Sequence, residues 1–181
     1  YNKATQELTA PGSTFKPLSA ITGLTEGVVS SSTFFPCSRK NEKVTPSPVC
    51  WIHPGGHGNL NVVGAIANSC NCYFYELGFR LGINDKGKYS SEAGVNTFEK
   101  YAKQFGLGEP SGLEISERTP NISDEDSVRS AIGQGTHVYS TSQLAKYING
   151  VANKGTVYDL SLLYKVVDKD GKTKKEYKPS I

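Results

Sequence analysis

The sequence predicts a mainly helical domain with a small β-hairpin near its C-terminus. Two features support this fold class. Segments with apolar residues at helical spacing recur along the chain, and Ser, Gly or Asn stands at their ends. After the last of them, residues 157–167 are rich in Val, Leu and Tyr, as strands are, and Asp170-Gly171 is typical of a tight hairpin turn.

Length and composition are those of a globular domain or a part of one. The chain has 181 residues, of which 36% are hydrophobic and 20% charged, and this balance excludes a disordered protein. The net charge of +3 gives no reason to propose nucleic acid as a partner. No stretch approaches the roughly 20 apolar residues that span a bilayer. The chain starts at Tyr1 and contains no Met, so we expect a piece of a longer protein.

Residues that cap or break helices predict where the individual helices and loops begin and end. Residues 1–12 are expected to be a loop, and a helix is expected to begin at Ser13, with Pro17 in its first turn and Gly27 at its end. Residues 30–60 form a long connection rich in Ser, Pro and Gly, a type that tends to be functional. Further helices are expected over residues 62–68, 73–81, 92–105 and 140–153, with residues 107–135 mostly loop.

The first candidate motif is Ser13-Thr14-Phe15-Lys16. At the start of a helix, residues three apart share a face, so Ser13 and Lys16 can touch. A serine hydroxyl becomes a nucleophile when a neighbouring base takes its proton, and a buried lysine can be that base. Taken alone, the pair is more simply a helix cap and a surface lysine.

The second candidate motif is Ser69-Cys70-Asn71, at the break between two helices. Ser69 could relay a proton, and Asn71 could hydrogen-bond a substrate amide. A helix break often carries Ser and Asn only as caps, so the tripeptide by itself is weak evidence.

Together the motifs occur in the order of Ser-x-x-Lys and Ser-x-Asn in serine enzymes that recognise penicillin. The sequences around these motifs are also similar to those of known proteins, over nearly the whole chain. The sequence resembles the penicillin-binding protein transpeptidases, and among them the class B, elongation-type members. The similar stretches are residues 9–17 (TAPGSTFKP), 51–61 (WIHPGGHGNLN), 69–75 (SCNCYFY), 105–108 (FGLG) and 131–135 (AIGQG).

This resemblance implies an α/β, penicillin-binding protein/β-lactamase-like fold and a peptidoglycan D,D-transpeptidase that cross-links the cell wall. Ser13 would be the acylated nucleophile and Lys16 its general base. Ser69 would pass the proton to the leaving amine, and Asn71 would hold the amide of the donor peptide. The implied partners are peptidoglycan stem peptides, β-lactam antibiotics and cell-wall synthesis proteins. The resemblance also implies that the protein lies at the extracytoplasmic face of the membrane, anchored by a segment outside this chain. It implies that acyl transfer needs no cofactor.

One element of the family pattern is absent. The third motif, Lys-[Ser/Thr]-Gly, does not occur, because Lys172-Thr173-Lys174 lacks the glycine. We therefore expect residues 1–181 to be a partial transpeptidase domain without its first strands and its Lys-Thr-Gly strand, which could oligomerise to cover apolar surface. The alternatives are a non-catalytic β-lactam sensor or scaffold of the same fold, and a structural zinc-bound domain with incidental motifs.

Three cysteines and a histidine make a plausible tetrahedral zinc set. The candidate ligands are Cys37, Cys50, His57 and Cys70, with His53 as an alternative. A Cys37–Cys50 disulfide or free thiols would also fit these spacings, and Cys72 is expected to be a free thiol. Zinc is slightly favoured, because a disulfide leaves His57 and Cys70 without a role.

Overall fold

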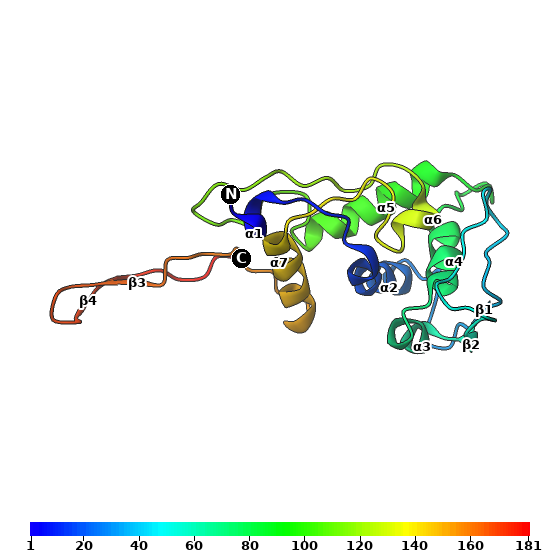
Figure 1. Cartoon of the computed structure of the whole chain (residues 1–181), viewed down its shortest axis with the longest axis horizontal. Coiled ribbons are helices and arrows are strands. Elements are labelled where there is room, and N and C mark those ends of the chain that lie inside the picture. Colours follow the sequence, from blue (N-terminus) through cyan, green and yellow to red (C-terminus); the bar gives the residue numbers. More distant parts are fainter. The chain divides into compact units, whose positions relative to one another are not determined.

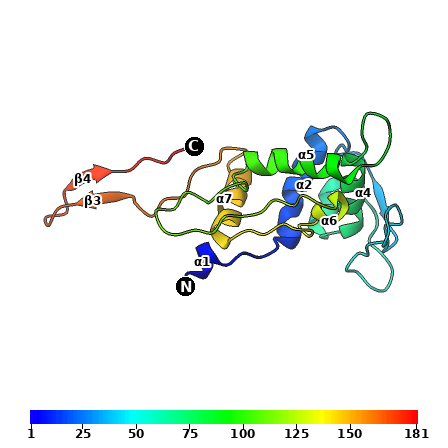
Figure 2. The same ribbon diagram turned by 90° about the horizontal axis from the view of Figure 1, so that it is seen from above.

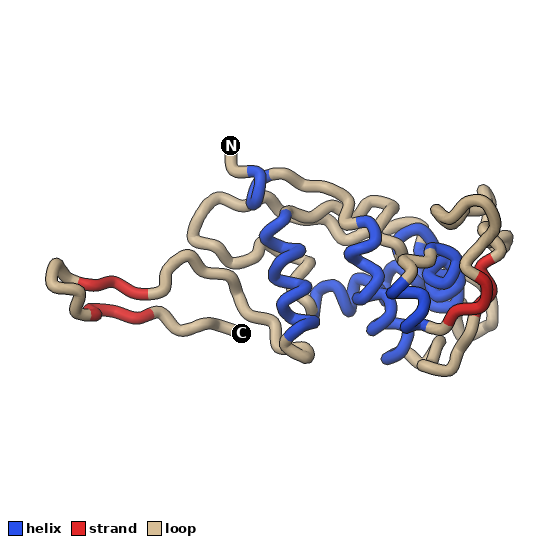
Figure 3. Tube along the Cα trace, turned by 60° about the horizontal axis from the view of Figure 1, so that its bottom comes forward, coloured by secondary structure: helices blue, strands red, loops and turns tan.

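The computed structural model describes residues 1–181, and its regular structure is mainly helical (Figure 3). In chain order the elements are α1 (Lys3–Gln6), the 3-10 helix η1 (Gly12–Phe15), α2 (Lys16–Thr25), β1 (Phe35–Cys37), β2 (Gly58–Leu60), α3 (Val62–Ala67), α4 (Asn71–Leu81), α5 (Ser91–Gln104), α6 (Ser127–Ser130), α7 (Thr141–Ala152), β3 (Lys165–Val167) and β4 (Thr173–Glu176). No helix is both long and apolar enough to cross a bilayer.

The chain forms two compact units. The central unit comprises residues 10–102 and 122–138, and the terminal unit comprises residues 1–9, 103–121 and 139–181. Both predicted motifs and all four cysteines lie in the central unit, whereas the predicted hairpin lies in the terminal unit.

Helix α4 is the centre of the central unit. It buries Phe74 and Leu77 completely, and α2, α6 and β1 pack against it (Figure 2). The close approach of α6 depends on Gly78, where a Cβ would lie 2.5 Å from the Ser127 carbonyl oxygen. Each fully buried aromatic or aliphatic side chain contributes about 1.5–3 kcal/mol, and these contributions together are the main force that holds the unit together.

The start of α2 differs from the predicted cap. Ser13 lies in η1, one turn before α2, and no side chain caps the first residue of α2. Pro17 lies in the first turn of α2 as expected. Since the Ser13 hydroxyl is not used to cap the helix, it remains available for other contacts, and the side chain is exposed.

Two glycines far apart in sequence meet beside Ser13. Gly12 and Gly133 both adopt positive φ angles, of 56° and 73°, and the Gly12 N–H donates to the Gly133 carbonyl at 3.0 Å. A Cβ on Gly133 would lie 2.1 Å from the Gly12 carbonyl oxygen. The stretch 131–135 therefore supports the backbone that carries Ser13.

Gly133→Ala is expected to lower the free energy of unfolding by about 3 kcal/mol, because it adds a backbone clash to the strain of a positive φ. Gly27→Ala is the matched control. Gly27 has a similar φ of 72° but nothing within 4 Å of an added Cβ, so it should cost only about 1 kcal/mol. Urea unfolding of both variants measures the difference. Equal losses would show that the Gly12–Gly133 contact is not tight.

The terminal unit is built on α7. Ser140 and Gln143 form a capping box at its start, within the helix expected over residues 140–153. Lys146 on this helix is buried and pairs with the Asp159 carboxylate at 2.7 Å. The strand β3 pairs antiparallel with β4, and the two form the hairpin (Figure 1).

Some predicted bounds were wrong. The expected strand 157–167 is a strand only from Lys165, because the N–H groups of Asp159 and Leu160 donate instead to the Ser180 and Ser111 carbonyls. The expected loop 1–12 contains α1, whose N-terminus is capped by the Asn2 side chain. The expected loop 107–135 contains α6, and the long connection 30–60 contains the paired strands β1 and β2.

Candidate active site

Ser13, Lys16 and Ser69 are joined by hydrogen bonds in the central unit. The Lys16 Nζ donates to the Ser69 Oγ at 3.0 Å, and the Ser69 hydroxyl donates to the Ser13 Oγ at 3.0 Å. Lys16 also donates to the Asn71 Oδ1 at 2.6 Å and to the Ser69 carbonyl oxygen at 2.8 Å. The structure thus brings together the four residues of the two motifs, with Ser69 between Lys16 and Ser13.

Lys16 is buried, with 2% of its surface exposed. Burial lowers the pKa of its ammonium group from 10.5 to about 8, against the opposing effect of nearby Cys50 and Cys70. A lysine with this pKa is neutral in a sizeable fraction of molecules near neutral pH. It can therefore accept a proton from the hydroxyl network.

The break between α3 and α4 places Ser69 and Asn71 toward Lys16. Ser69 has a φ of 49°, unusual for a residue with a side chain, and its N–H donates to the Ile66 carbonyl. Asn71 is the first residue of α4. Cys70, between them, is completely buried and belongs to a second cluster.

That second cluster is the predicted metal set. The ligand atoms of Cys37, Cys50, His57 and Cys70 all lie within 4.8 Å of one another. The His57 Nδ1 is 3.5 Å from the Cys37 Sγ and 3.6 Å from the Cys50 Sγ. Zn–S bonds of about 2.3 Å and Zn–N bonds of about 2.0–2.1 Å, set at a tetrahedral angle, give an N···S separation of about 3.6 Å. The donor set therefore fits a tetrahedral zinc ion.

The thiols of this cluster differ in acidity. Burial raises the pKa of the Cys37 thiol, but hydrogen bonds from the His57 and Arg39 backbone and from the His57 and Cys72 side chains outweigh it and lower the pKa to about 6. Burial raises the pKa of the Cys70 thiol to about 12. The Asn71 N–H donates to the Cys50 Sγ at 3.3 Å, so one backbone amide ties the two clusters together.

The cysteine loop, which we define as residues 37–57, is held by protein contacts as well. Lys43 pairs with Glu76 of α4 at 2.7 Å, and Arg129 of α6 donates to the Pro46 carbonyl at 2.7 Å. The Tyr75 hydroxyl of α4 donates to the Val49 carbonyl at 3.2 Å. These three contacts come from helices that also build the core, so the loop lies in a defined position.

The sequence also suggested a Cys37–Cys50 disulfide, a free Cys72 thiol and His53 as an alternative ligand. None of the four cysteines is in a disulfide, so the Cys37–Cys50 disulfide is not formed. Cys72 is free as expected, and it is buried. His53 is not among the clustered ligand atoms.

Trp51 contributes to the site without having been singled out as a site residue. Its side chain is 62% exposed, yet its Nε1 donates to the Ser69 carbonyl oxygen at 3.0 Å. Its ring lies 5.3 Å from the His57 ring. In the sequence, Trp51 stood out only as the first residue of the family-like stretch 51–61, because its partner carbonyl at Ser69 is distant along the chain.

The chain is similar in sequence to known proteins. The chain is 27% identical over 205 aligned positions to a Salmonella typhimurium protein named peptidoglycan D,D-transpeptidase MrdA, covering 99% of this chain and 29% of that protein. The chain therefore spans less than a third of the length of this relative.

Solved structures share the fold. Penicillin-binding protein A from M. tuberculosis, solved as an imipenem acyl-enzyme complex, matches with a TM-score of 0.81 at 20% identity, over 99% of this chain and 40% of that one. PBP2 from Helicobacter pylori, solved in complex with MreC, matches with a TM-score of 0.77 at 23% identity, over 89% of this chain and 30% of that one. The family model of the penicillin-binding protein transpeptidase domain matches residues 1–180, and the chain belongs to this family.

Proposed function

We propose that the protein carrying this chain is a peptidoglycan D,D-transpeptidase with Ser13 as its nucleophile. The observation that carries the proposal is the hydrogen-bonded path from the buried Lys16 through Ser69 to the exposed Ser13. Burial lowers the pKa of Lys16, and groups with perturbed pKa values cluster at functional sites. The relative named peptidoglycan D,D-transpeptidase MrdA supports the same reaction.

The geometry supports a two-step acyl transfer. Neutral Lys16 takes the Ser13 proton through Ser69, and the Ser13 Oγ attacks the carbonyl of the terminal D-Ala-D-Ala bond. The Ser13 N–H stabilises the oxyanion as half of an oxyanion hole. Lys16 then returns the proton through Ser69 to the leaving D-alanine. An amine of a second stem peptide then attacks the acyl-enzyme carbonyl, the ester bond to the Ser13 Oγ breaks, and the amine proton passes through Lys16 and Ser69 back to the Ser13 oxygen. Asn71 holds the donor amide throughout.

The proposed function also specifies the rest of the domain, the substrates, the location and the partners of the enzyme. Residues 1–181 form part of the transpeptidase domain, and its first strands and Lys-Thr-Gly strand come from other segments of the protein. Stem peptides are the substrates, β-lactams acylate Ser13, and the domain works at the extracytoplasmic face of the membrane. Partners of the cell-wall machinery are supported by the complex of the Helicobacter pylori PBP2 with MreC.

Labelling with a fluorescent penicillin tests the nucleophile. The full-length protein is expected to form one covalent adduct, mapped by peptide mass spectrometry to Ser13, and Ser13→Ala is expected to form none. Labelling that persists in Ser13→Ala would refute the assignment. A protein that labels at Ser13 but does not cross-link stem peptides would be the sensor or scaffold of the same fold.

The acylation rate is expected to follow the protonation state of Lys16. Its pKa of about 8 means that the neutral, proton-accepting form increases about tenfold per pH unit below pH 8 and saturates above it. The rate of Ser13 acylation should therefore rise with pH and level off near pH 8–9. Stopped-flow measurements between pH 6 and 10 check this, and a rate that is flat across the range would contradict Lys16 as the base.

We also propose that the Cys/His cluster binds one structural zinc ion. Three thiolates and one imidazole are the donor set that zinc prefers in closed structural sites, and three of the four residues are buried. When bound, zinc would cross-link the cysteine loop to Cys70. Cys70 lies between Ser69 and Asn71, so this cross-link would hold both side chains in position toward Lys16.

Gly56→Ala is expected to weaken zinc binding by tenfold or more. Its Cβ would lie 1.8 Å from the Cys37 carbonyl oxygen, and the clash would move Cys37, whose thiolate is a proposed zinc ligand. Gly55→Ala is the control, because nothing lies within 4 Å of its added Cβ, and it reports the effect of backbone strain alone at its positive φ of 83°. Competition with a chromogenic chelator measures both affinities. Equal affinities would mean that Gly56 does not shape the cluster.

A further inference from the structure

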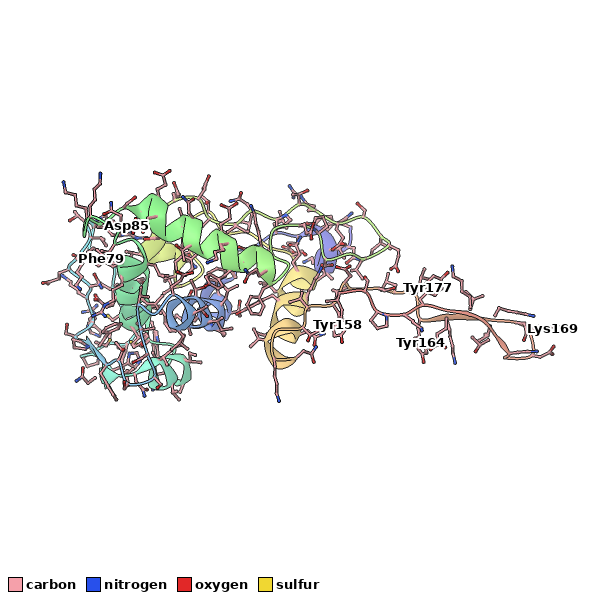
Figure 4. The ribbon with its side chains drawn as sticks, turned by 180° about the vertical axis from the view of Figure 1, so that it is seen from behind. Phe79, Asp85, Tyr158, Tyr164, Lys169 and Tyr177 are labelled. Atoms are coloured by element: carbon pink, nitrogen blue, oxygen red, sulfur yellow. The ribbon has the colours of Figure 1, made fainter.

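A cavity of about 620 Å³ opens at the base of the β3–β4 hairpin, entirely within the terminal unit. Three tyrosines line it, Tyr158 from the segment after α7 and Tyr164 and Tyr177 from the two sides of the hairpin base (Figure 4). Asn149, Glu176 and Lys178 add polar groups to its wall. This cavity is separate from the Ser13 and cysteine clusters, which lie in the central unit.

The walls of the cavity are fixed by buried and local contacts. Asp159 accepts from the buried Lys146 at 2.7 Å and from the Ser180 hydroxyl at 2.8 Å. Its N–H donates to the Ser180 carbonyl at 3.0 Å, which closes the base of the hairpin. On the opposite side, Glu114 accepts from the Leu162 N–H at 2.9 Å. Contacts within the protein therefore position the walls of the cavity.

The two hairpin tyrosines are also held in place. The Tyr177 N–H donates to the Tyr164 carbonyl at 2.8 Å, which sets the two residues opposite each other. The Lys165 ammonium lies 5.6 Å from the Tyr164 ring centroid, and the Lys175 ammonium lies 4.4 Å from that of Tyr177. Tyr164 nevertheless remains 66% exposed. The Tyr164 ring is therefore accessible to a ligand in the cavity.

The chemistry of the lining favours a carbohydrate. A pyranose ring presents an apolar C–H face, which stacks on aromatic rings, and an edge of hydroxyls, which bond to carboxylates, amides and tyrosine hydroxyls. The lining offers both kinds of group: three aromatic rings, the Glu176 carboxylate and the Asn149 amide. The volume lies in the range of roughly 300–1,000 Å³ found for ligand pockets, and suits a few sugar units.

We propose that this cavity binds the glycan strand of the peptidoglycan, as an oligosaccharide of N-acetylated sugars. This inference rests on the proposed function, since the stem peptides that Ser13 would join hang from that strand. A rigid site for the glycan on the same chain would hold the polymer near the enzyme independently of the stem peptide. The ring faces would bind the sugars, and Glu176 and Asn149 would bind their hydroxyl and acetamido groups.

The test is calorimetric titration of the full-length protein with the N-acetylglucosamine tetramer, with the glucose tetramer as a chemical control. Wild type is expected to bind the acetylated tetramer more tightly than the glucose tetramer. Tyr164→Ala and Tyr177→Ala are expected to weaken this binding about tenfold or more, and Tyr164→Phe should retain most of it. Lys169→Ala, at the tip of the same hairpin, is the matched control and should bind as wild type does (Figure 4).

The outcomes separate this inference from the proposed function. Absent binding by wild type, or binding by Tyr164→Ala and Tyr177→Ala equal to that of wild type, would overturn the glycan site, as would binding of stem peptide alone in the cavity. Penicillin labelling of Ser13 in the wild-type preparation reports on the proposed function by itself. Thermal unfolding of each variant shows whether a loss of binding is a loss of folding. If the alanine variants unfold, Glu176→Gln, which removes the lining carboxylate but keeps its size, should still weaken binding, and wild-type binding by that folded variant would overturn the site.

Discussion

Replacing Lys16 by methionine is expected to lower the rate of Ser13 acylation by a factor of about 1,000, within the range by which general bases accelerate reactions. Methionine matches the length and burial of lysine but cannot accept a proton. It also leaves the Asn71 Oδ1 and the Ser69 oxygens without their lysine donor. Time-resolved labelling with a fluorescent penicillin measures the rate.

The control is Lys100→Met, which removes an exposed lysine that pairs with Glu26 on the surface of the central unit. Its acylation rate should equal that of the wild type. Thermal unfolding and zinc content should be compared for both variants, because a collapsed site would also react slowly. A folded Lys16→Met protein that acylates at the wild-type rate would show that another group activates Ser13.

Loss of the cluster metal is expected to have the second largest effect. If free zinc exceeds its dissociation constant a thousandfold, binding stabilises the folded state by about 4 kcal/mol. For a chain of this size that corresponds to a fall in Tm of about 10 °C when zinc is removed by a chelator or by Cys70→Ala. Acylation should also slow, because Cys70 lies between Ser69 and Asn71. Calorimetry, with metal analysis of the same samples, measures both.

Cys72→Ala provides the matched control for this experiment. Cys72 is buried in α4 next to Asn71, but its thiol lies outside the four-ligand set. The variant should keep one zinc ion per chain and a Tm close to that of the wild type. If Cys72→Ala and Cys70→Ala lost metal equally, the ligand assignment would be wrong.

The candidate catalytic residues and the candidate metal ligands could be singled out from the sequence because short local patterns mark most of them. Ser13 and Lys16 share one turn, and Ser69 and Asn71 flank one residue at a helix break. Family resemblance then linked motifs that no periodicity connects. That resemblance is confirmed by the family match over residues 1–180. The four-ligand cluster follows from residue types alone, and the structure brings its members together.

The features that could not be predicted from the sequence are contacts between segments that are distant along the chain. The Trp51 bond to the Ser69 carbonyl and the Arg129 bond to the Pro46 carbonyl use backbone acceptors, which no side-chain pattern marks. The strand 157–167 was overpredicted because its composition favours a strand, whereas Asp159 and Leu160 hydrogen-bond to other segments. Tertiary contacts override strand propensity at such positions.

The contacts that hold the cysteine loop have a consequence for metal affinity. A ligand binds with an apparent dissociation constant equal to the intrinsic one divided by the fraction of molecules already in the binding-competent form. Lys43, Tyr75 and Arg129 anchor the loop to α4 and α6 through protein contacts alone, and each of these contacts raises that fraction. In the proposed zinc site they would therefore lower the conformational cost of binding and tighten the apparent affinity for the metal.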